Sequence, residues 1–216
     1  MYNCENIIPD LLNCVVFAAE AHKHQKRKAD GSSYICHPLR VAKILIDSGF
    51  SDIHLLRAAV LHDTLEDTNT TVAELHRRFG PQVTGYVQEC TTDKSLSKVE
   101  QKKQQVEKMK TISEPAYFIK IADAIDNLSD LANNPPPDWT EARIRGYFIW
   151  KGKCLTKRFN DFDLYASKLF ETFWDVFREG FKLDGKHYDI FNLGGDWREE
   201  DPEQMLQDYY DLVAKL

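Results

Sequence analysis

The sequence predicts an all-α protein, and three features of its 216 residues carry that prediction. Apolar residues recur at helical spacing along nearly the whole chain. Proline, glycine, serine and aspartate interrupt this pattern where helices should begin and end. The composition is 43% hydrophobic and 29% charged, without a low-complexity run or a repeat. This is typical of one globular domain, with or without an appendage.

The first third of the chain contains two predicted helices. The first runs from about residue 8 to 26 and ends in a dense basic run, residues 23–28. An Asp-Gly turn separates it from a second helix that runs from Leu39 to Asp47 and that Gly49 ends. Pro38 suits the first position of that helix, which leaves His37 at or near its N-cap.

The middle of the chain is organised around a helix predicted from Asp52 to about Asp67, with Ser51 as its cap. A capping box at residues 71–74 begins a short helix, and Gly80-Pro81 separates it from another that ends near residue 90. A highly charged, solvent-facing helix follows at residues 96–110. Residues 114–133 are apolar on nearly all sides, so we expect a buried helix there.

The remaining residues predict an amphipathic helix at 139–155 and an aromatic-rich helix at 159–181. Residues 180–197 are rich in turn formers and could hold a short hairpin or an irregular loop. A terminal helix begins at the Asp201-Pro202 signal and runs to about Ala214. We expect residues 1–158 to form the functional domain and residues 159–216 to be a helical extension packed on it. The aromatic extension could equally bury a dimer interface in a homo-oligomer.

Charge and cysteine content narrow the class of protein. The net charge of −6 argues against a general nucleic-acid binder, which would present a basic face. The five cysteines are odd in number and lack paired metal spacing, so they are interpreted as reduced thiols. No N-terminal leader and no membrane-spanning apolar run is visible. We therefore expect a cytoplasmic protein with no nucleic-acid or membrane partner.

Four polar residues lie on one side of the central helix: His62, Asp63, Glu66 and Asp67. The same side carries apolar residues one and two turns earlier, so this polar patch should face inward. Carboxylates crowded together repel one another, and burial raises the cost, unless a positive charge lies among them. A divalent cation is the simplest candidate. The alternative is an acidic helix end that happens to contain a His-Asp pair.

A second buried carboxylate is expected at Asp123, inside the apolar helix at residues 114–133. Asn127 lies one turn beyond it on the same side. Lys120, three residues earlier, leaves open an intrahelical ion pair as the alternative to a metal ligand. His37 alone, before a proline, would be a weak metal candidate.

These residues occur within a set of ordered motifs. The dipeptide His62-Asp63, with His37 upstream and Asp123 downstream, resembles the HD phosphohydrolase superfamily. More narrowly, residues 27–28, 34–38, 61–68, 79–80 and 120–123 resemble the hydrolase domain of RelA/SpoT-type alarmone enzymes. The chain is most similar to their stand-alone, hydrolase-only branch over about residues 10–158. This resemblance implies an HD-domain helical bundle.

The resemblance also implies roles for individual residues. His37, His62, Asp63 and Asp123 match metal ligands that usually hold Mn²⁺, and such a mixed nitrogen and oxygen set suits a divalent ion. Glu66 and Asp67 match the pair that orients and deprotonates the attacking water. The substrate-binding positions comprise Arg27, Lys28 and Asn127 near the nucleoside, and Lys94, Lys98, Arg143 and Tyr147 near the pyrophosphate.

The chain departs from the alarmone enzymes after Asp123, where they generally carry Arg or Lys and this sequence has Ala124. Residues beyond about 160 do not resemble the nucleotidyltransferase domain, so no synthetase activity is expected. The resemblance implies metal-dependent removal of the 3′-pyrophosphate from the small-molecule substrate ppGpp or pppGpp. Two alternatives stay open: an HD-type phosphatase acting on another nucleotide such as NADPH, dNMP or NTP, and a catalytically weak alarmone-binding sensor.

Overall fold

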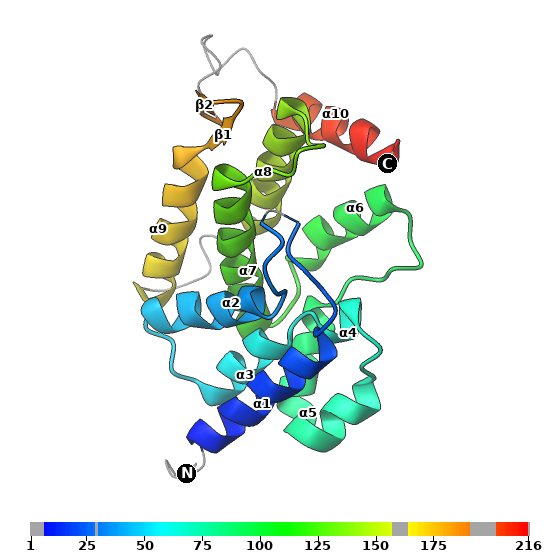
Figure 1. The fold of residues 1–216 in the computed structure, drawn as a ribbon, viewed down its shortest axis with the longest axis vertical. Coiled ribbons are helices and arrows are strands. Elements are labelled where there is room, and N and C mark those ends of the chain that lie inside the picture. The colour runs from blue at the N-terminus through cyan, green and yellow to red at the C-terminus, as the bar shows by residue number, and fades with distance from the viewer. Residues whose placement is uncertain (1–6, 29, 157–163, 191–201, 216) are drawn as a thin grey trace.

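Nearly all regular structure in the protein is helical, as the sequence predicts (Figure 1). The structure, a computed structural model, describes residues 7–28, 30–156, 164–190 and 202–215. Its helices are α1 (Ile7–Ala21), α2 (Cys36–Asp47), α3 (Ile53–Leu61), α4 (Thr64–Asp67), α5 (Val72–Cys90), α6 (Lys98–Lys108), α7 (Glu114–Asn133), α8 (Glu141–Leu155), α9 (Leu164–Glu179) and α10 (Pro202–Ala214). Its strands are β1 (Phe181–Leu183) and β2 (Lys186–Tyr188). They pair antiparallel, so the turn-rich segment holds a hairpin rather than an irregular loop.

Helix α7 forms the centre of the fold. It packs against α2, α3, α5, α8, α9 and β1 (Figure 1). Its apolar residues are buried on nearly all sides, which confirms the prediction from its composition. The helix begins where Ser113 Oγ accepts a hydrogen bond from the Ala116 N–H, and the capping satisfies one otherwise unpaired donor. Because α7 is buried, Asp123 in the middle of this helix lies in the core.

The central helix expected at residues 52–67 is broken in two, and that prediction was wrong in detail. Helix α3 ends at Leu61 and α4 begins at Thr64, with His62 and Asp63 in the turn between them. The His62 Nδ1–H donates to the Ala59 carbonyl at 2.8 Å, and the Thr64 hydroxyl donates to the Leu61 carbonyl at 2.7 Å. These side chains satisfy carbonyls at the end of α3, so the helix can stop there.

Other helix ends also differ from the expectation. Helix α1 ends at Ala21, so most of the basic run lies in turns and in a single bridge between Lys26 and Ser33. Helix α2 starts one residue before His37, which places His37 and Pro38 in its first turn. Asp52, not Ser51, caps α3 by accepting from the Leu55 N–H.

Two later boundaries follow from local backbone chemistry. Gly80, with φ of 83°, kinks α5 at the predicted Gly-Pro break. Helix α8 begins at Glu141, two residues after the predicted start at residue 139, because Thr140 caps it. Ser97 and Glu100 form a capping box at the start of α6, so this helix is shorter than the predicted 96–110.

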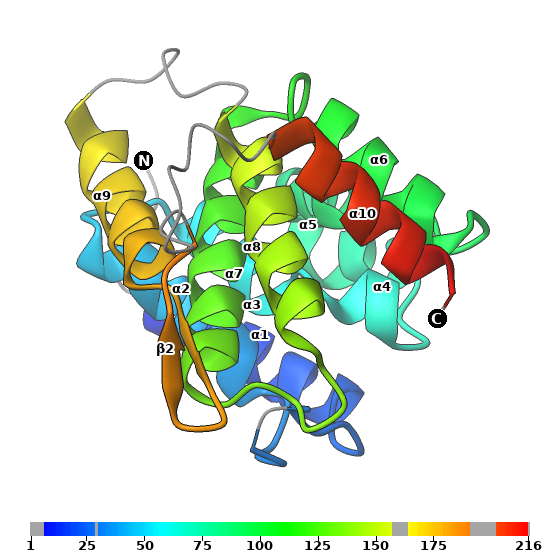
Figure 2. The same cartoon turned by 90° about the horizontal axis from the view of Figure 1, so that it is seen from above.

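The C-terminal extension packs on the preceding helices. Helix α9 lies against α7, and α10 crosses α8 and α6 (Figure 2). The side chains of Leu169, Phe170, Phe173 and Phe177 are buried within the chain's own core, which leaves them no role in a dimer interface. The side chain of Leu164 lies outside the described part. The division at residue 158 stays a prediction.

Four of the five cysteines are described, and all four are free thiols: Cys14, Cys36, Cys90 and Cys154. Cys4 lies outside the described residues. Within the described ranges, no helix has both the length and the apolar character needed to cross a bilayer.

Candidate metal centre

Three residues from different helices meet in the core with one ligand atom each. His37 comes from the first turn of α2, His62 from the end of α3 and Asp123 from α7. Their ligand atoms all lie within 4.8 Å of one another. All three side chains are buried. The packing of α2 and α3 against α7 therefore brings together residues that are 86 positions apart in the sequence, counting from His37 to Asp123 (123 − 37).

His62 presents a free lone pair to this cluster. Its Nδ1 donates to the Ala59 carbonyl, so the neutral ring carries its lone pair on Nε2. That Nε2 is buried and forms no hydrogen bond with the described residues, although Asp63 Oδ1 lies 3.2 Å from it. An unpaired buried polar atom is costly. A metal ion at this nitrogen removes the cost, so the arrangement fits a metal site.

His37 is oriented in a similar way by a carboxylate. Its Nδ1 lies 2.6 Å from Asp126 Oδ2, while Nε2 faces Asp123 Oδ1 at 3.3 Å and Asp63 Oδ2 at 3.5 Å. A carboxylate on the outer nitrogen is the usual support of a metal-binding histidine. Burial lowers the pKa of His37, but the three carboxylates outweigh it and raise this pKa to about 10. The surroundings of Nε2 therefore favour a positive charge.

Asp63 lies against both imidazoles. Its Oδ1 is 3.2 Å from His62 Nε2, and its Oδ2 accepts a 2.6 Å hydrogen bond from the Tyr34 hydroxyl. Burial raises the pKa of Asp63, but His62 and His37 outweigh it and hold this pKa well below its usual range. Asp63 is thus an ionised carboxylate beside the group of three, although it does not share their common 4.8 Å range.

Asp123 contacts cations as well as imidazoles. Lys120, on the same helix, lies 3.5 Å from Oδ2, so the intrahelical ion pair that the sequence left open is present. Lys151 of α8 lies closer, at 3.1 Å, and nothing in its sequence position indicated this contact. Burial raises the pKa of Asp123, but Lys151, Lys120 and His37 outweigh it and hold this pKa well below its usual range.

Glu66 and Asp67 occupy α4, directly after the His62-Asp63 turn. Glu66 Oε2 accepts a hydrogen bond from the Thr92 N–H at 2.8 Å. Asp67 Oδ1 accepts from Lys94 Nζ at 2.5 Å. Both carboxylates are therefore fixed by the loop that follows α5, and both can act as acceptors toward a water near the cluster.

A cavity of about 400 Å³ is connected to this centre by two of its lining residues. Tyr34 donates a hydrogen bond to Asp63, and Asn127 donates one to Asp123. The cavity contains four of the predicted substrate-binding residues: Arg27, Lys28, Asn127 and Tyr147. Asp67 also lines it, which connects the cavity with α4. Trp139 and Tyr34 supply aromatic faces. A cavity of this size with cations and aromatic rings suits a planar, negatively charged ligand.

Arg27 is held at one side of this cavity by α7. Its Nε and Nη2 both donate to Asp130 Oδ2, at 2.9 and 2.5 Å, and Nη2 also donates to Asn127 Oδ1 at 3.1 Å. The guanidinium lies 5.9 Å from the centre of the Tyr34 ring. The side chain is thereby pre-positioned rather than free to rotate.

The other three predicted phosphate contacts do not line this cavity. Lys94 contacts it indirectly, through Asp67. The guanidinium of Arg143 lies 4.1 Å from the Trp139 ring centre, and Trp139 is a lining residue. Lys98 lies in the first turn of α6.

Several residues at the site were not predicted as contributors: Tyr34, Arg40, Asp126, Asp130, Trp139 and Lys151. One signal was available. Asp123, Asp126, Asn127 and Asp130 recur at helical spacing, so their side chains share a face of α7. Arg40 and Arg27 then neutralise the carboxylates of Asp126 and Asp130.

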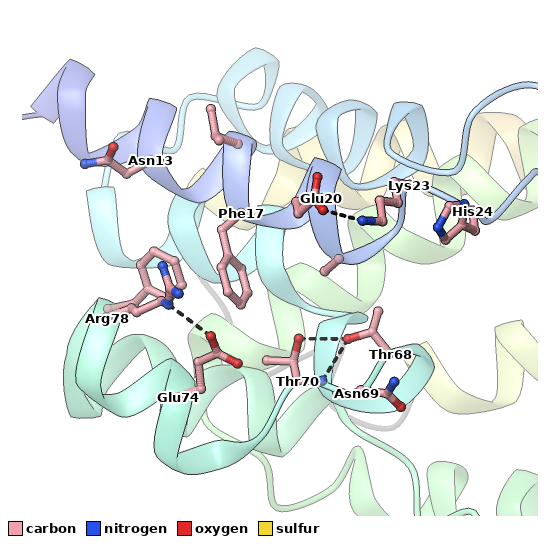
Figure 3. A pocket seen from close by; sticks show the side chains of 13 residues that line it. Asn13, Phe17, Glu20, Lys23, His24, Thr68, Asn69, Thr70, Glu74 and Arg78 are labelled. Atoms are coloured by element: carbon pink, nitrogen blue, oxygen red, sulfur yellow. Dashed lines mark hydrogen bonds and ion pairs between the residues drawn. The ribbon is translucent and has the colours of Figure 1, made fainter.

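A larger cavity, about 790 Å³, lies elsewhere, between α1, α5 and the segment that follows α4 (Figure 3). Phe17 and the ion pairs Glu20–Lys23 and Glu74–Arg78 line it. None of the three clustered ligand residues lines either cavity, but only the smaller one is lined by Tyr34 and Asn127, which hydrogen-bond Asp63 and Asp123. The volume of a cavity alone therefore does not identify the reaction site.

The chain is similar to known proteins in sequence and in fold. A profile of the HD domain family matches residues 14–150. The mouse (Mus musculus) protein named guanosine-3′,5′-bis(diphosphate) 3′-pyrophosphohydrolase MESH1 is 47% identical over 147 residues, which are 67% of this chain and 82% of the mouse protein. The human (Homo sapiens) protein of the same name is 46% identical over the same length and the same two shares.

A solved structure shows the same fold. It is described as a metazoan orthologue of SpoT that hydrolyses ppGpp and plays a role in starvation responses. It matches with a TM-score of 0.72 and 36% identity, over 81% of this chain and 97% of that chain. The helical fold, the buried cluster of two histidines and one aspartate, and these similarities all indicate one family. The chain belongs to the HD domain family.

Proposed function

We propose that this protein hydrolyses ppGpp or pppGpp at the 3′-pyrophosphate, giving GDP or GTP and free pyrophosphate. The observation that carries the proposal is the meeting of His37, His62 and Asp123 beside a cavity of about 400 Å³ lined by Arg27 and Tyr147. The names of the mouse and human relatives support the same activity.

The metal ligands of the proposed site are His37, His62, Asp63 and Asp123, and the proposed ion is Mn²⁺. Two imidazole nitrogens with carboxylate oxygens suit a borderline divalent ion. The unpaired Nε2 of His62 and the carboxylates around His37 support this set. When bound, a divalent ion lowers the pKa of a coordinated water and polarises a phosphoryl oxygen.

Glu66 and Asp67 are the proposed catalytic pair. A carboxylate oxygen of this pair takes a proton from the attacking water as the oxygen approaches the phosphorus on the 3′ side. The 3′ oxygen–phosphorus bond breaks, and the 3′ oxygen takes up a proton. Hydrogen bonds from Thr92 and Lys94 hold the two carboxylates in place during this step.

The nucleoside is proposed to occupy the cavity that Arg27, Lys28, Asn127 and Tyr147 line. Arg27 offers a planar face for the base, and Lys28 offsets phosphate charge. Lys94, Lys98 and Arg143 are proposed to meet the pyrophosphate groups at the rim. The net charge of −6 makes this local group of cations the attractive feature for an anionic small molecule.

We also propose a cytoplasmic location, supported by the four described cysteines, none of which forms a disulfide.

Residues 1–158 are proposed to carry the reaction. Residues 159–216 are proposed to support that domain, since α9 and α10 pack on α7, α8 and α6.

A nucleotide panel tests the activity. The protein is stripped with a chelator, reloaded with Mn²⁺ and incubated with ppGpp, NADPH, dNMP and NTP, and the products are resolved by ion-exchange chromatography. GDP with pyrophosphate from ppGpp is the expected outcome. Inorganic phosphate from NADPH or dNMP, with ppGpp untouched, would replace the proposed substrate by another nucleotide.

A variant of Glu66, compared with the wild type, separates an enzyme from a sensor. Glu66→Gln should retain Mn²⁺ and bind ppGpp while turnover falls, because the amide cannot accept the proton. If the wild-type protein binds ppGpp tightly and does not convert it, the protein is a sensor and the catalytic assignment of Glu66 is wrong.

A further inference from the structure

The two carboxylate oxygens of Asp123 face different kinds of partner. Oδ1 lies 3.3 Å from His37 Nε2 and 3.9 Å from His62 Nε2, and it accepts a 2.5 Å hydrogen bond from the Asn127 amide. Oδ2 faces two ammonium groups, Lys151 at 3.1 Å and Lys120 at 3.5 Å. One oxygen is therefore available beside the imidazoles, and the other is held by lysines.

Lys151 is buried, with 5% of its surface exposed. Asp123 is the one carboxylate within ion-pair distance of Lys151 in the part of the chain that the structure describes. The rings of Trp150 and Tyr147 lie 5.1 and 5.8 Å from its Nζ. A buried ammonium needs such a partner, so the contact with Asp123 fixes where this side chain ends.

Lys151 brings Asp123 a second cation in addition to Lys120 of α7. The residue after Asp123 is Ala124, so the helix has no cation at that position. Lys151 brings one to Asp123 from the neighbouring helix α8. Because it approaches Oδ2 rather than Oδ1, it does not occupy the space between Asp123 and the imidazoles.

We propose that Lys151 is a positioning residue that keeps Oδ2 of Asp123 away from the metal, so that only Oδ1 is offered to it. This inference rests on the proposed function. A carboxylate can bind a metal through one oxygen or through both. A catalytic metal needs an open position for water or substrate. Lys151 preserves that position by engaging the second oxygen.

The test uses the full-length protein with Lys151→Met, which removes the charge at similar volume, and Lys151→Arg, which keeps it. Lys43→Met is the control, because Lys43 is exposed and pairs with the exposed Asp47 at the C-terminal end of α2. Three quantities are measured: Mn²⁺ affinity of the stripped protein by calorimetry, kcat and KM for ppGpp, and the thermal midpoint.

We expect Lys151→Met to bind Mn²⁺ at least as tightly as the wild type, because a repulsive charge is removed and Oδ2 of Asp123 keeps only the more distant lysine, Lys120 at 3.5 Å. We expect its kcat to fall by about tenfold or more, as for other residues that support a metal ligand, with KM changed by less than about threefold. Lys151→Arg should recover most of kcat, and the control should match the wild type.

Other results overturn the inference. A rise in KM with unchanged kcat would make Lys151 a substrate contact. A loss of Mn²⁺ affinity that follows a loss of thermal stability would make it a structural residue. Unchanged kcat and affinity would leave it no role in positioning. If Lys151→Met does not fold, Lys151→Gln, which retains a hydrogen-bond donor, replaces it under the same criteria.

The calorimetry does not depend on the substrate. If the wild type converts a nucleotide other than ppGpp, the proposed function fails, and kcat and KM are then measured on that nucleotide. If the wild type converts none, the Mn²⁺ affinity of Lys151→Met still decides, because a weaker affinity contradicts the inference.

Discussion

Oδ2 of Asp126 lies 2.6 Å from Nδ1 of His37 and joins the centre of α7 to the first turn of α2. Arg40 donates to the same carboxylate from α2. Burial raises the pKa of Asp126, but His37 and Arg40 outweigh it and lower this pKa from its ordinary value. Asp126 is thus an ionised acceptor that fixes the direction of the His37 ring.

Asp126→Asn should weaken Mn²⁺ binding by about 10- to 100-fold, the usual effect of removing a carboxylate behind a metal-binding histidine. The amide keeps the shape but loses the charge that makes His37 Nε2 a better ligand. Calorimetry on the stripped protein measures the change. Asp47→Asn, on the exposed end of α2, is the control. Equal affinities in the two variants would show that Asp126 does not act through His37.

Arg27 gives a prediction for substrate binding. Its guanidinium lines the cavity and is fixed by Asp130 and Asn127. Arg27→Lys keeps the charge but loses the planar, forked geometry. We expect KM for ppGpp to rise by about tenfold with kcat nearly unchanged, because binding that is equal in ground and transition states affects KM alone.

The control for Arg27 is Arg78→Lys, at the larger cavity of Figure 3, where Arg78 pairs with Glu74. Its steady-state constants should match the wild type. If Arg78→Lys raised KM and Arg27→Lys did not, the larger cavity would be the nucleotide site.

The sequence predicted what depends on local pattern. A buried helix was predicted at residues 114–133, where α7 lies, because a helix that is apolar on nearly all sides is stable only in the core. The kink at Gly80 was predictable because its φ of 83° is one that glycine adopts without strain. The break at His62-Asp63 was missed, since hydrogen bonds from His62 and Thr64 to α3 carbonyls decide it and the helical spacing of the segment hides it.

The site was predicted only in part for a related reason. His37, His62 and Asp123 carry motifs, and their meeting agrees with the resemblance. Lys151 lies 28 residues after Asp123 in the sequence (151 − 123), on another helix, and no local pattern connects them. Such pairs become visible only when the packing of α8 near α7 is known.

The contact between the C-terminal extension and α8 gives a prediction for stability. A Cβ added to Gly146 would lie 2.6 Å from Cβ and Cδ2 of Tyr209, so α10 would have to move. Gly146→Ala should therefore lower the free energy of unfolding by about 1–3 kcal/mol, as overpacking does, despite the better helix propensity of alanine. Urea denaturation measures the change.

Gly85→Ala is the matched control for that experiment. Gly85 lies in α5, and nothing is within 4 Å of an added Cβ. This variant should gain about 0.5–1 kcal/mol from helix propensity alone. If both variants were stabilised, α10 would not pack on α8 in solution as described.

Lys102 lies where α6, α8 and α10 meet. Its Nζ is 3.6 Å from the centre of the Trp150 ring, 5.3 Å from that of Tyr147 and 5.1 Å from that of Tyr209. Burial, with a smaller effect from the charge of Lys151, lowers the pKa of Lys102 to about 7. An unfolded lysine has its ordinary value of 10.5, so folding and proton binding at this residue are linked.

Between pH 7 and 10.5 the unfolded chain holds a proton on Lys102 that the folded protein has released. Stability therefore rises with pH in this window through Lys102, and below about pH 7 its contribution is constant and unfavourable. Lys102→Met removes the dependence, so the stability of the wild type relative to this variant should increase from pH 7 to 10 in urea denaturation. Lys103→Met, the exposed neighbour, should run parallel to the wild type across the same range. A wild-type curve parallel to that of Lys102→Met would mean that Lys102 stays charged among the three rings.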